Sequence, residues 1–211
     1  MGFKDQYKEK LAEKIIKGLN KRNMEGFYCE TKEEALKKAL EIIPKRASVC
    51  WGGSESIKEA GLISALKGGS YKIYDRDEAK TPEEKLSIMR EGMFSDFFIG
   101  SSNAITYDGE LINIDGAGNR VSAYVWGPEN VLLLVSLNKA VPDVETGVKR
   151  VRNNAAAPNC LRLNIANPCA VTGACGNCLS ESTICCQILV TRFSKIKGRI
   201  KVVLVGEDLG Y

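Results

Sequence analysis

The uninterrupted apolar run VLLLV, residues 131–135, constrains the fold of this chain more than any other stretch. A short apolar run without polar alternation is typical of a strand that is buried on both faces of a sheet. We therefore expect residues 131–135 to form a central strand. Further apolar runs that predict strands occupy residues 26–29, 47–51, 71–74, 96–100, 111–114, 187–193 and 199–205.

Between these runs, apolar residues recur at helical spacing. The pattern predicts a helix over residues 4–22, and Thr31 with Glu34 forms a capping box for a second helix that ends at Pro44. Further helices are expected over residues 57–66, 81–89 and 143–152. Because strands alternate with helices, we expect an α/β fold with a mostly parallel sheet flanked by helices.

No linker, internal repeat or low-complexity stretch divides the sequence, so we expect one domain over residues 1–211. Residues 1–24 would form its N-terminal helix. Residues 154–186 would form a cysteine-rich insertion near the C-terminus, with residues 154–180 irregular in structure.

Composition limits the kinds of partner. The 211 residues are 44% apolar and 27% charged, which is ordinary for a soluble globular protein, and the net charge is +4. Acidic residues are interspersed among the basic ones of the first helix, so no nucleic-acid binding is expected. No segment approaches the ~18 apolar residues of a membrane span, and the N-terminus lacks a signal-peptide core. We therefore expect a cytoplasmic protein without membrane insertion.

The sequence contains eight cysteines and no histidine. The lack of histidine excludes histidine acid–base catalysis, Ser/His and Cys/His nucleophile systems, and mixed Cys/His zinc sites. In a reducing cytoplasm the cysteines are expected to be metal ligands, reactive thiols or buried apolar residues rather than disulfides. Cys29, Cys50 and Cys160 lie in or beside apolar segments and are expected in the core.

The other five cysteines follow the pattern C-x5-C-x2-C-x6-C-C, which ends at Cys186. A C-x2-C pair suits one metal ion, and four thiolates can hold zinc or an iron–sulfur cluster. The candidate metal ligands are Cys169, Cys175, Cys178 and Cys185. A redox dithiol at Cys175 and Cys178, or loosely clustered free thiols, are the alternatives.

Four polar loops each follow an apolar strand. Their candidate ligand-binding residues are Gly52, Gly53, Ser54 and Ser56, then Asn103, then Asp115, Gly116, Gly118, Asn119 and Arg120, and finally Asn138 and Lys139. Open α/β sheets bind ligands outside the carboxyl ends of their strands, so we expect these loops to share one cleft. Arg120 and Lys139 suit an anionic ligand, and a buried structural salt bridge with Asp115 is the alternative for both.

The third loop, GAGNRV over residues 116–121, differs from the dinucleotide-binding motif GxGxxG by a valine at the third glycine. The acidic residue that should follow about 20 positions later is missing, since Glu129 comes too early. The first loop also lacks the GxxxxGK[ST] pattern of a P-loop. The sequence therefore favours a small anionic metabolite over a dinucleotide.

Several motifs together resemble the lactate-utilisation LUD-domain family, over about residues 96–211. They are IGSSNAITYDGELINIDGAGNRV, NKAVPD, RVRNNAAAPN, the PC-x5-C-x2-C-x6-C pattern and the final VGEDLGY, and WGGSES at residues 51–56 is consistent with them. The resemblance implies a fold similar to the ribose-5-phosphate isomerase, glucosamine-6-phosphate isomerase and CoA-transferase group.

The resemblance also implies a function. It suggests a subunit or accessory of an iron–sulfur system that oxidises L-lactate to pyruvate, with iron–sulfur proteins as partners. In the related isomerases a glycine/serine loop holds phosphate, which would correspond to Gly52, Gly53 and Ser54 here, and Asp115 is the candidate catalytic residue. Two alternatives stay open: a stand-alone isomerase-like or CoA-transferase-like enzyme, and a scaffold protein with a structural metal knuckle.

Overall fold

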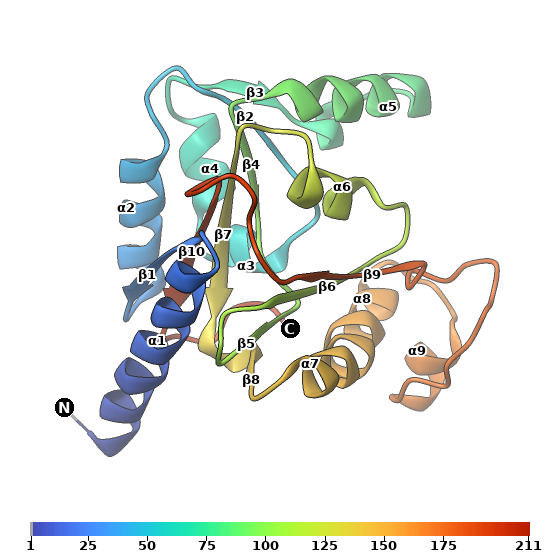
Figure 1. The fold of residues 1–211 in the computed structure, drawn as a ribbon. Coiled ribbons are helices and arrows are strands. Elements are labelled where there is room, and N and C mark those ends of the chain that lie inside the picture. Colours follow the sequence, from blue (N-terminus) through green and yellow to red (C-terminus); the bar gives the residue numbers. More distant parts are fainter. Residues whose placement is uncertain (1) are drawn as a thin grey trace.

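The computed structural model describes residues 2–211 and has a six-stranded sheet at its centre (Figure 1). Its strands, in order across the sheet, are β1 (Glu25–Cys29), β10 (Ile200–Val205), β7 (Asn130–Ser136), β4 (Phe97–Gly100), β2 (Ser48–Trp51) and β3 (Lys72–Tyr74). All neighbouring strands run parallel. β7 pairs with β10 on one side and β4 on the other, which confirms the predicted central strand and the α/β class.

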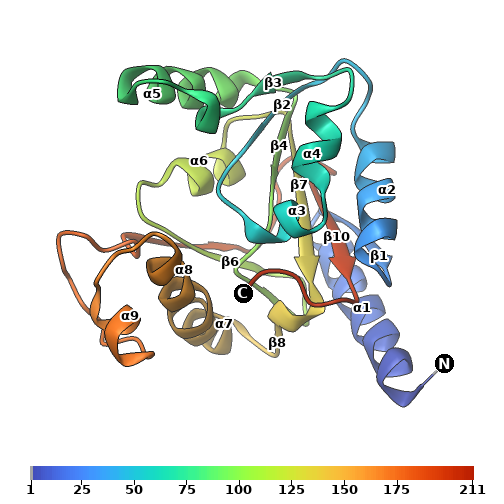
Figure 2. The same cartoon turned by 180° about the vertical axis from the view of Figure 1, so that it is seen from behind.

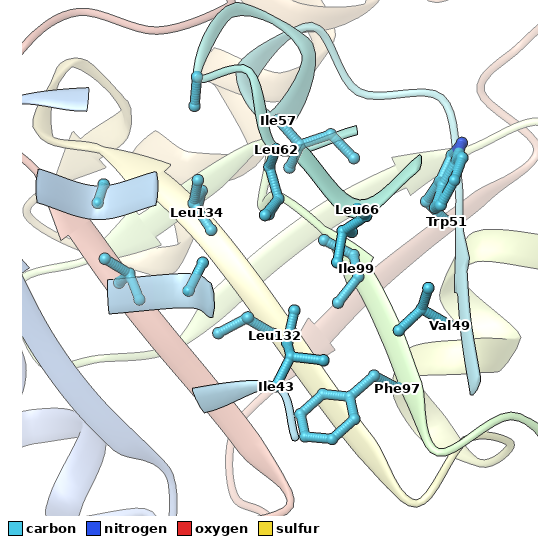
Figure 3. Close-up of a cluster of buried hydrophobic side chains, with 14 of the residues drawn as sticks. Ile43, Val49, Trp51, Ile57, Leu62, Leu66, Phe97, Ile99, Leu132 and Leu134 are labelled. Carbon is cyan, nitrogen blue, oxygen red and sulfur yellow. The ribbon is translucent and has the colours of Figure 1, made fainter. Parts of the chain in front are cut away.

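Helices cover both faces of this sheet (Figures 1 and 2). On one face, α2 (Lys32–Ile42) packs on β1 and β10, whereas α3 (Glu55–Glu59) and α4 (Leu62–Lys67) lie over β7. Figure 3 shows Ile57, Leu62 and Leu66 of these two helices beside Leu132 and Leu134. On the other face, α1 (Phe3–Lys21) and α6 (Asn119–Val125) pack on Val131, Leu133 and Val135. Successive side chains of a strand point to opposite faces, and both faces of β7 are covered by helices, which is why all of residues 131–135 are apolar.

A second sheet of four strands departs from the prediction. Its order is β8 (Ala140–Val141), β5 (Ala104–Thr106), β6 (Leu111–Asp115) and β9 (Gln187–Thr191), and β6 is antiparallel to both of its neighbours. The strands expected over residues 111–114 and 187–193 therefore exist, but they do not join the parallel sheet. A tight turn with Gly109 at φ +88° reverses the chain after β5 and pairs β6 back onto it.

Two helical predictions need correction. The helix expected over residues 57–66 is interrupted at Gly61, whose φ of +73° separates α3 from α4. The segment 154–180, expected to be irregular, is largely helical as far as residue 172. After α7 (Val144–Arg150), a π-helical turn, η4 (Val151–Ala155), leads into α8 (Ala156–Arg162), and α9 (Pro168–Thr172) follows.

The remaining helical segments are α5 (Pro82–Glu91) and the 3-10 turns η1 (Arg76–Glu78), η2 (Gly92–Phe94) and η3 (Leu137–Lys139). The N-terminal helix predicted over residues 4–22 matches α1 to within one residue at either end. Across residues 2–211, no helix combines the length and the apolar character that a membrane span requires.

Candidate functional site

A polar cleft of about 280 Å³ opens at the carboxyl ends of β2, β4 and β7, which are neighbours in the parallel sheet. The sequence-predicted residues on its wall are Gly53, Ser54, Ser56, Asn103, Asp115, Gly116, Asn119, Arg120 and Lys139. Asp115 ends β6, so both sheets contribute to the cleft. The end of the chain, marked C in Figures 1 and 2, also lies here, since Gly210 and Tyr211 line the cleft.

Three of the predicted residues do not line the cleft. Gly52 is buried beneath it, and Gly118, at φ +82°, precedes α6 and donates its N–H to Asp115 Oδ1 at 2.7 Å. Asn138 is exposed and lies in a separate surface depression beside the start of α1. The two glycines shape turns that carry lining residues, whereas Asn138 belongs to a different surface.

Arg120 holds the wall of the cleft together. Its Nε lies 3.3 Å from Asp115 Oδ2, its Nη1 donates to Asn113 Oδ1 at 2.9 Å, and its Nη2 donates to Asn103 Oδ1 at 2.8 Å. Nη2 also donates to the carbonyl oxygen of Ile114. With most of its N–H groups engaged, Arg120 matches the structural salt bridge that the sequence left open, rather than a free anion anchor.

Lys139 is the other predicted cation, and its environment differs. The side chain is only 3% exposed, and Nζ donates to Ser56 Oγ at 2.6 Å and to Ser101 Oγ at 3.3 Å. None of the ion pairs formed within residues 2–211 includes it. Burial, together with the nearby charge of Arg150, lowers the pKa of Lys139 to about 7. Near neutral pH this lysine is therefore only partly charged.

Sequence reasoning did not identify several residues of the cleft, among them Arg76, Arg162 and Tyr211. Arg76 comes from η1, directly after β3. Its Nε and the Oγ of Ser54 are both buried without a hydrogen-bond partner in the protein. Arg162 comes from α8 and donates to Asn159 Oδ1 and to the hydroxyl of Tyr211.

A signal for Arg76 was present in the sequence. Residues 71–74 were predicted as a strand, and the polar residues that follow it form a fifth strand-end loop. Arg162 had no comparable signal, because the segment that carries it was expected to be irregular and far from any strand end.

The cysteine-rich segment reaches the cleft. Ile184 lies on the cleft wall, and the backbone N–H of Cys186 donates to the carbonyl oxygen of Asp115 at 2.9 Å. Burial and the neighbouring thiols raise the pKa of Cys185 to about 11; those thiols are Cys160, Cys169, Cys175 and Cys178.

The Sγ atoms of Cys160 and Cys169 lie 3.8 Å apart. No group of three or more Cys, Asp or Glu side chains within residues 2–211 is placed to hold a metal ion. The proposed metal site at Cys169, Cys175, Cys178 and Cys185 stays a prediction. Cys29, Cys50 and Cys160 are buried, as predicted.

The parallel central sheet, with polar loops at its strand ends, defines an α/β protein of the open-sheet class. The LUD domain family matches residues 12–205, and this chain belongs to that family. A DUF162 family protein from Deinococcus radiodurans has a similar structure, with a TM-score of 0.54 over 94% of this chain and 98% of that one. At 13% sequence identity, this likeness shows a shared fold.

Ribose 5-phosphate isomerase A from Neisseria gonorrhoeae gives a TM-score of 0.34 over 54% of each chain, with 17% identity. That likeness is too weak to establish a common fold. No curated protein matches the sequence.

Proposed function

We propose that this chain binds a small anionic metabolite, a carboxylate or a phosphate ester, in the cleft, as a subunit or accessory of a lactate-oxidising system. The observation that carries the proposal is the pair Ser54 Oγ and Arg76 Nε. Within residues 2–211 they are the only buried side-chain nitrogen or oxygen atoms without a hydrogen-bond partner, and both residues line the cleft. Buried polar groups are nearly always satisfied, so a bound group is expected to supply the missing partner.

The charges of the cleft support an anion. Asp115 is paired with Arg120, and Glu55 lies 3.8 Å from Arg162 Nη1, so neither carboxylate faces the cleft without a cation. Arg76 contributes a further guanidinium, whose planar set of donors fits the oxygens of a carboxylate or phosphate. Its Nε lies 3.9 Å from Asp77 Oδ1, but that carboxylate is exposed and does not line the cleft. The cleft therefore has more positive than negative charge for a ligand to meet.

Membership of the LUD family supports the metabolic role, because the family is associated with lactate utilisation. Its members act beside iron–sulfur proteins, so we also propose such proteins as partners. Co-purification from cells grown on lactate tests this part. Recovery of the chain alone, under conditions that preserve iron–sulfur complexes, would argue against these partners.

Isothermal titration with L-lactate, pyruvate, CoA and ribose 5-phosphate tests the ligand. We expect L-lactate or pyruvate to bind, and Arg76→Ala to weaken binding about tenfold or more, since a hydrogen bond to a charged group contributes about 1.5–3 kcal/mol. Arg192→Ala is the matched control, because Arg192 is exposed and lies outside the cleft. Failure of all four compounds to bind, with and without partner proteins, would contradict the proposal.

A further inference from the structure

Lys139 is not explained by anion binding alone. A lysine that anchors an anion acts through its full positive charge. Lys139 is instead buried, is held by two hydroxyl groups and has no carboxylate partner within residues 2–211. Burial lowers the pKa of Lys139, and the nearby charges of Arg150 and Arg120 act in the same direction, against the opposing effect of the Glu59 carboxylate. The balance favours the neutral amine, which is the nucleophilic form of lysine.

The amine is also held at the cleft. Lys139 lines the cavity together with Ser54 and Arg76, so a ligand in the cavity lies against all three residues. The hydroxyls of Ser56 and Ser101 accept hydrogen bonds from Nζ at 2.6 and 3.3 Å. These contacts restrict the amine in orientation, and the hydroxyls lie where they can pass protons to and from it.

We propose that Lys139 forms an imine with the carbonyl carbon of a 2-oxo acid bound in the cleft. This inference rests on the proposed function, which supplies the binding site for the carboxylate of the ligand. It adds that the ligand also has a carbonyl group, which reacts with Lys139. A 2-oxo acid fits both features, since its carboxylate suits the guanidinium of Arg76 and its adjacent carbonyl suits a neutral amine.

The reaction balances without a further reactant. The lone pair of Nζ attacks the carbonyl carbon, and a C–N bond forms as the C=O π electrons move to oxygen. Two protons from the amine nitrogen reach that oxygen, with the hydroxyls of Ser56 and Ser101 as relay groups, and the oxygen leaves as water. The product is an imine whose protonated form withdraws electrons from the neighbouring carbon atoms.

Reductive trapping tests the inference. The full-length protein is incubated at pH 7 with pyruvate and cyanoborohydride, and intact mass and peptide mapping locate the adduct. We expect one reduced pyruvate adduct, on Lys139, and none with L-lactate, which has no carbonyl group. Lys139→Met should lose the adduct, whereas Lys149→Met should keep it, since Lys149 is exposed and paired with Glu145.

The pH dependence gives a second readout. Lys139 has a pKa of about 7, so its trapping should rise through pH 7 and then level off, while exposed lysines, with pKa values of about 10.4, react well only at much higher pH. If Lys139→Met does not fold, the mapped position in the wild-type protein decides the question alone.

The two proposals fail separately. Binding of pyruvate by titration without an adduct on Lys139 would overturn the imine and leave the anion site standing. An adduct spread over many surface lysines would likewise overturn the imine. Absence of both binding and adduct would overturn the two proposals together.

Discussion

At the scale of single residues, Lys139 makes the folded protein bind protons differently from the unfolded chain. Its pKa is about 7 when folded and 10.5 in its ordinary environment, so between these values the unfolded chain binds more protons. Stability should then rise with pH from about 7 to about 10.5, because the cost of burying the ammonium is present in full below pH 7 and disappears above 10.5.

Urea unfolding of the wild-type protein and Lys139→Met, measured at several pH values, checks this prediction. The difference in unfolding free energy between the two should be flat below pH 6 and shift in favour of the wild type up to pH 10. Its upper bound is roughly 5 kcal/mol, from 1.36 kcal/mol per pKa unit. Other groups titrate in both proteins and cancel, so a pH-independent difference would contradict the assigned burial of Lys139.

The sequence identified Lys139 and Arg120 as candidates but did not distinguish their roles. Arg120 takes its partners from Asn103, in the loop before β5, and from Asn113 on β6. Lys139 takes Ser56 from α3, 83 residues away in the sequence. Only the tertiary arrangement decides which cation is neutralised by a carboxylate and which is buried without one. Residue type and spacing contain no information on that choice.

At the scale of elements, local patterns predicted the large strands and the helices α1, α2, α5 and α7, because hydrophobic periodicity is a local property. They merged α3 with α4 and missed α6, α8 and α9. β5 and β8 were missed, since strands of three and two residues are too short to show a pattern. β6 and β9 were found but assigned to the wrong sheet. Strand pairing joins residues far apart in sequence, here Leu111 with Thr191, and periodicity does not predict it.

The cysteine-rich segment is an element whose metal content can be measured. The predicted ligands Cys169, Cys175 and Cys178 lie close enough to Cys185 to raise the pKa of its thiol. We expect anaerobically purified protein to contain a thiolate-bound metal, and the double variant with Cys175→Ser and Cys178→Ser to lose it. Cys186→Ser is the control, because Cys186 is exposed and outside the predicted ligand set.

Metal analysis and a visible spectrum distinguish the possibilities. Broad absorbance near ~400 nm would identify an iron–sulfur cluster, and a colourless protein with bound zinc would identify a structural knuckle. A metal-free protein of undiminished stability would contradict the metal prediction altogether.

At the scale of the whole molecule, the cleft depends on how the two sheets are held together. Ser56, Ser101 and Lys139 follow β2, β4 and β7 of the parallel sheet, whereas Asp115 is the last residue of β6 in the second sheet. α1 packs against both layers, since Leu19 belongs to the same buried cluster as Ile105 and Leu111 of the second sheet and Val202 of the first. A change where α1 meets the second sheet should therefore reach the cleft.

Gly18→Ala tests this coupling. A Cβ atom at Gly18 would lie 2.2 Å from the carbonyl oxygen of Asp108, in the turn between β5 and β6, so α1 or the turn must move. Alanine normally stabilises a helix interior by up to about 1 kcal/mol relative to glycine, whereas overpacking costs about 1–3 kcal/mol. We expect a lower melting temperature and weaker binding of the cleft ligand, although Gly18 does not line the cleft.

Gly68→Ala is the control, because its φ is −80° and its Cβ would make an ordinary contact of 3.4 Å. A Gly18→Ala protein as stable as the wild type, with unchanged binding, would show that the two sheets are positioned independently of α1.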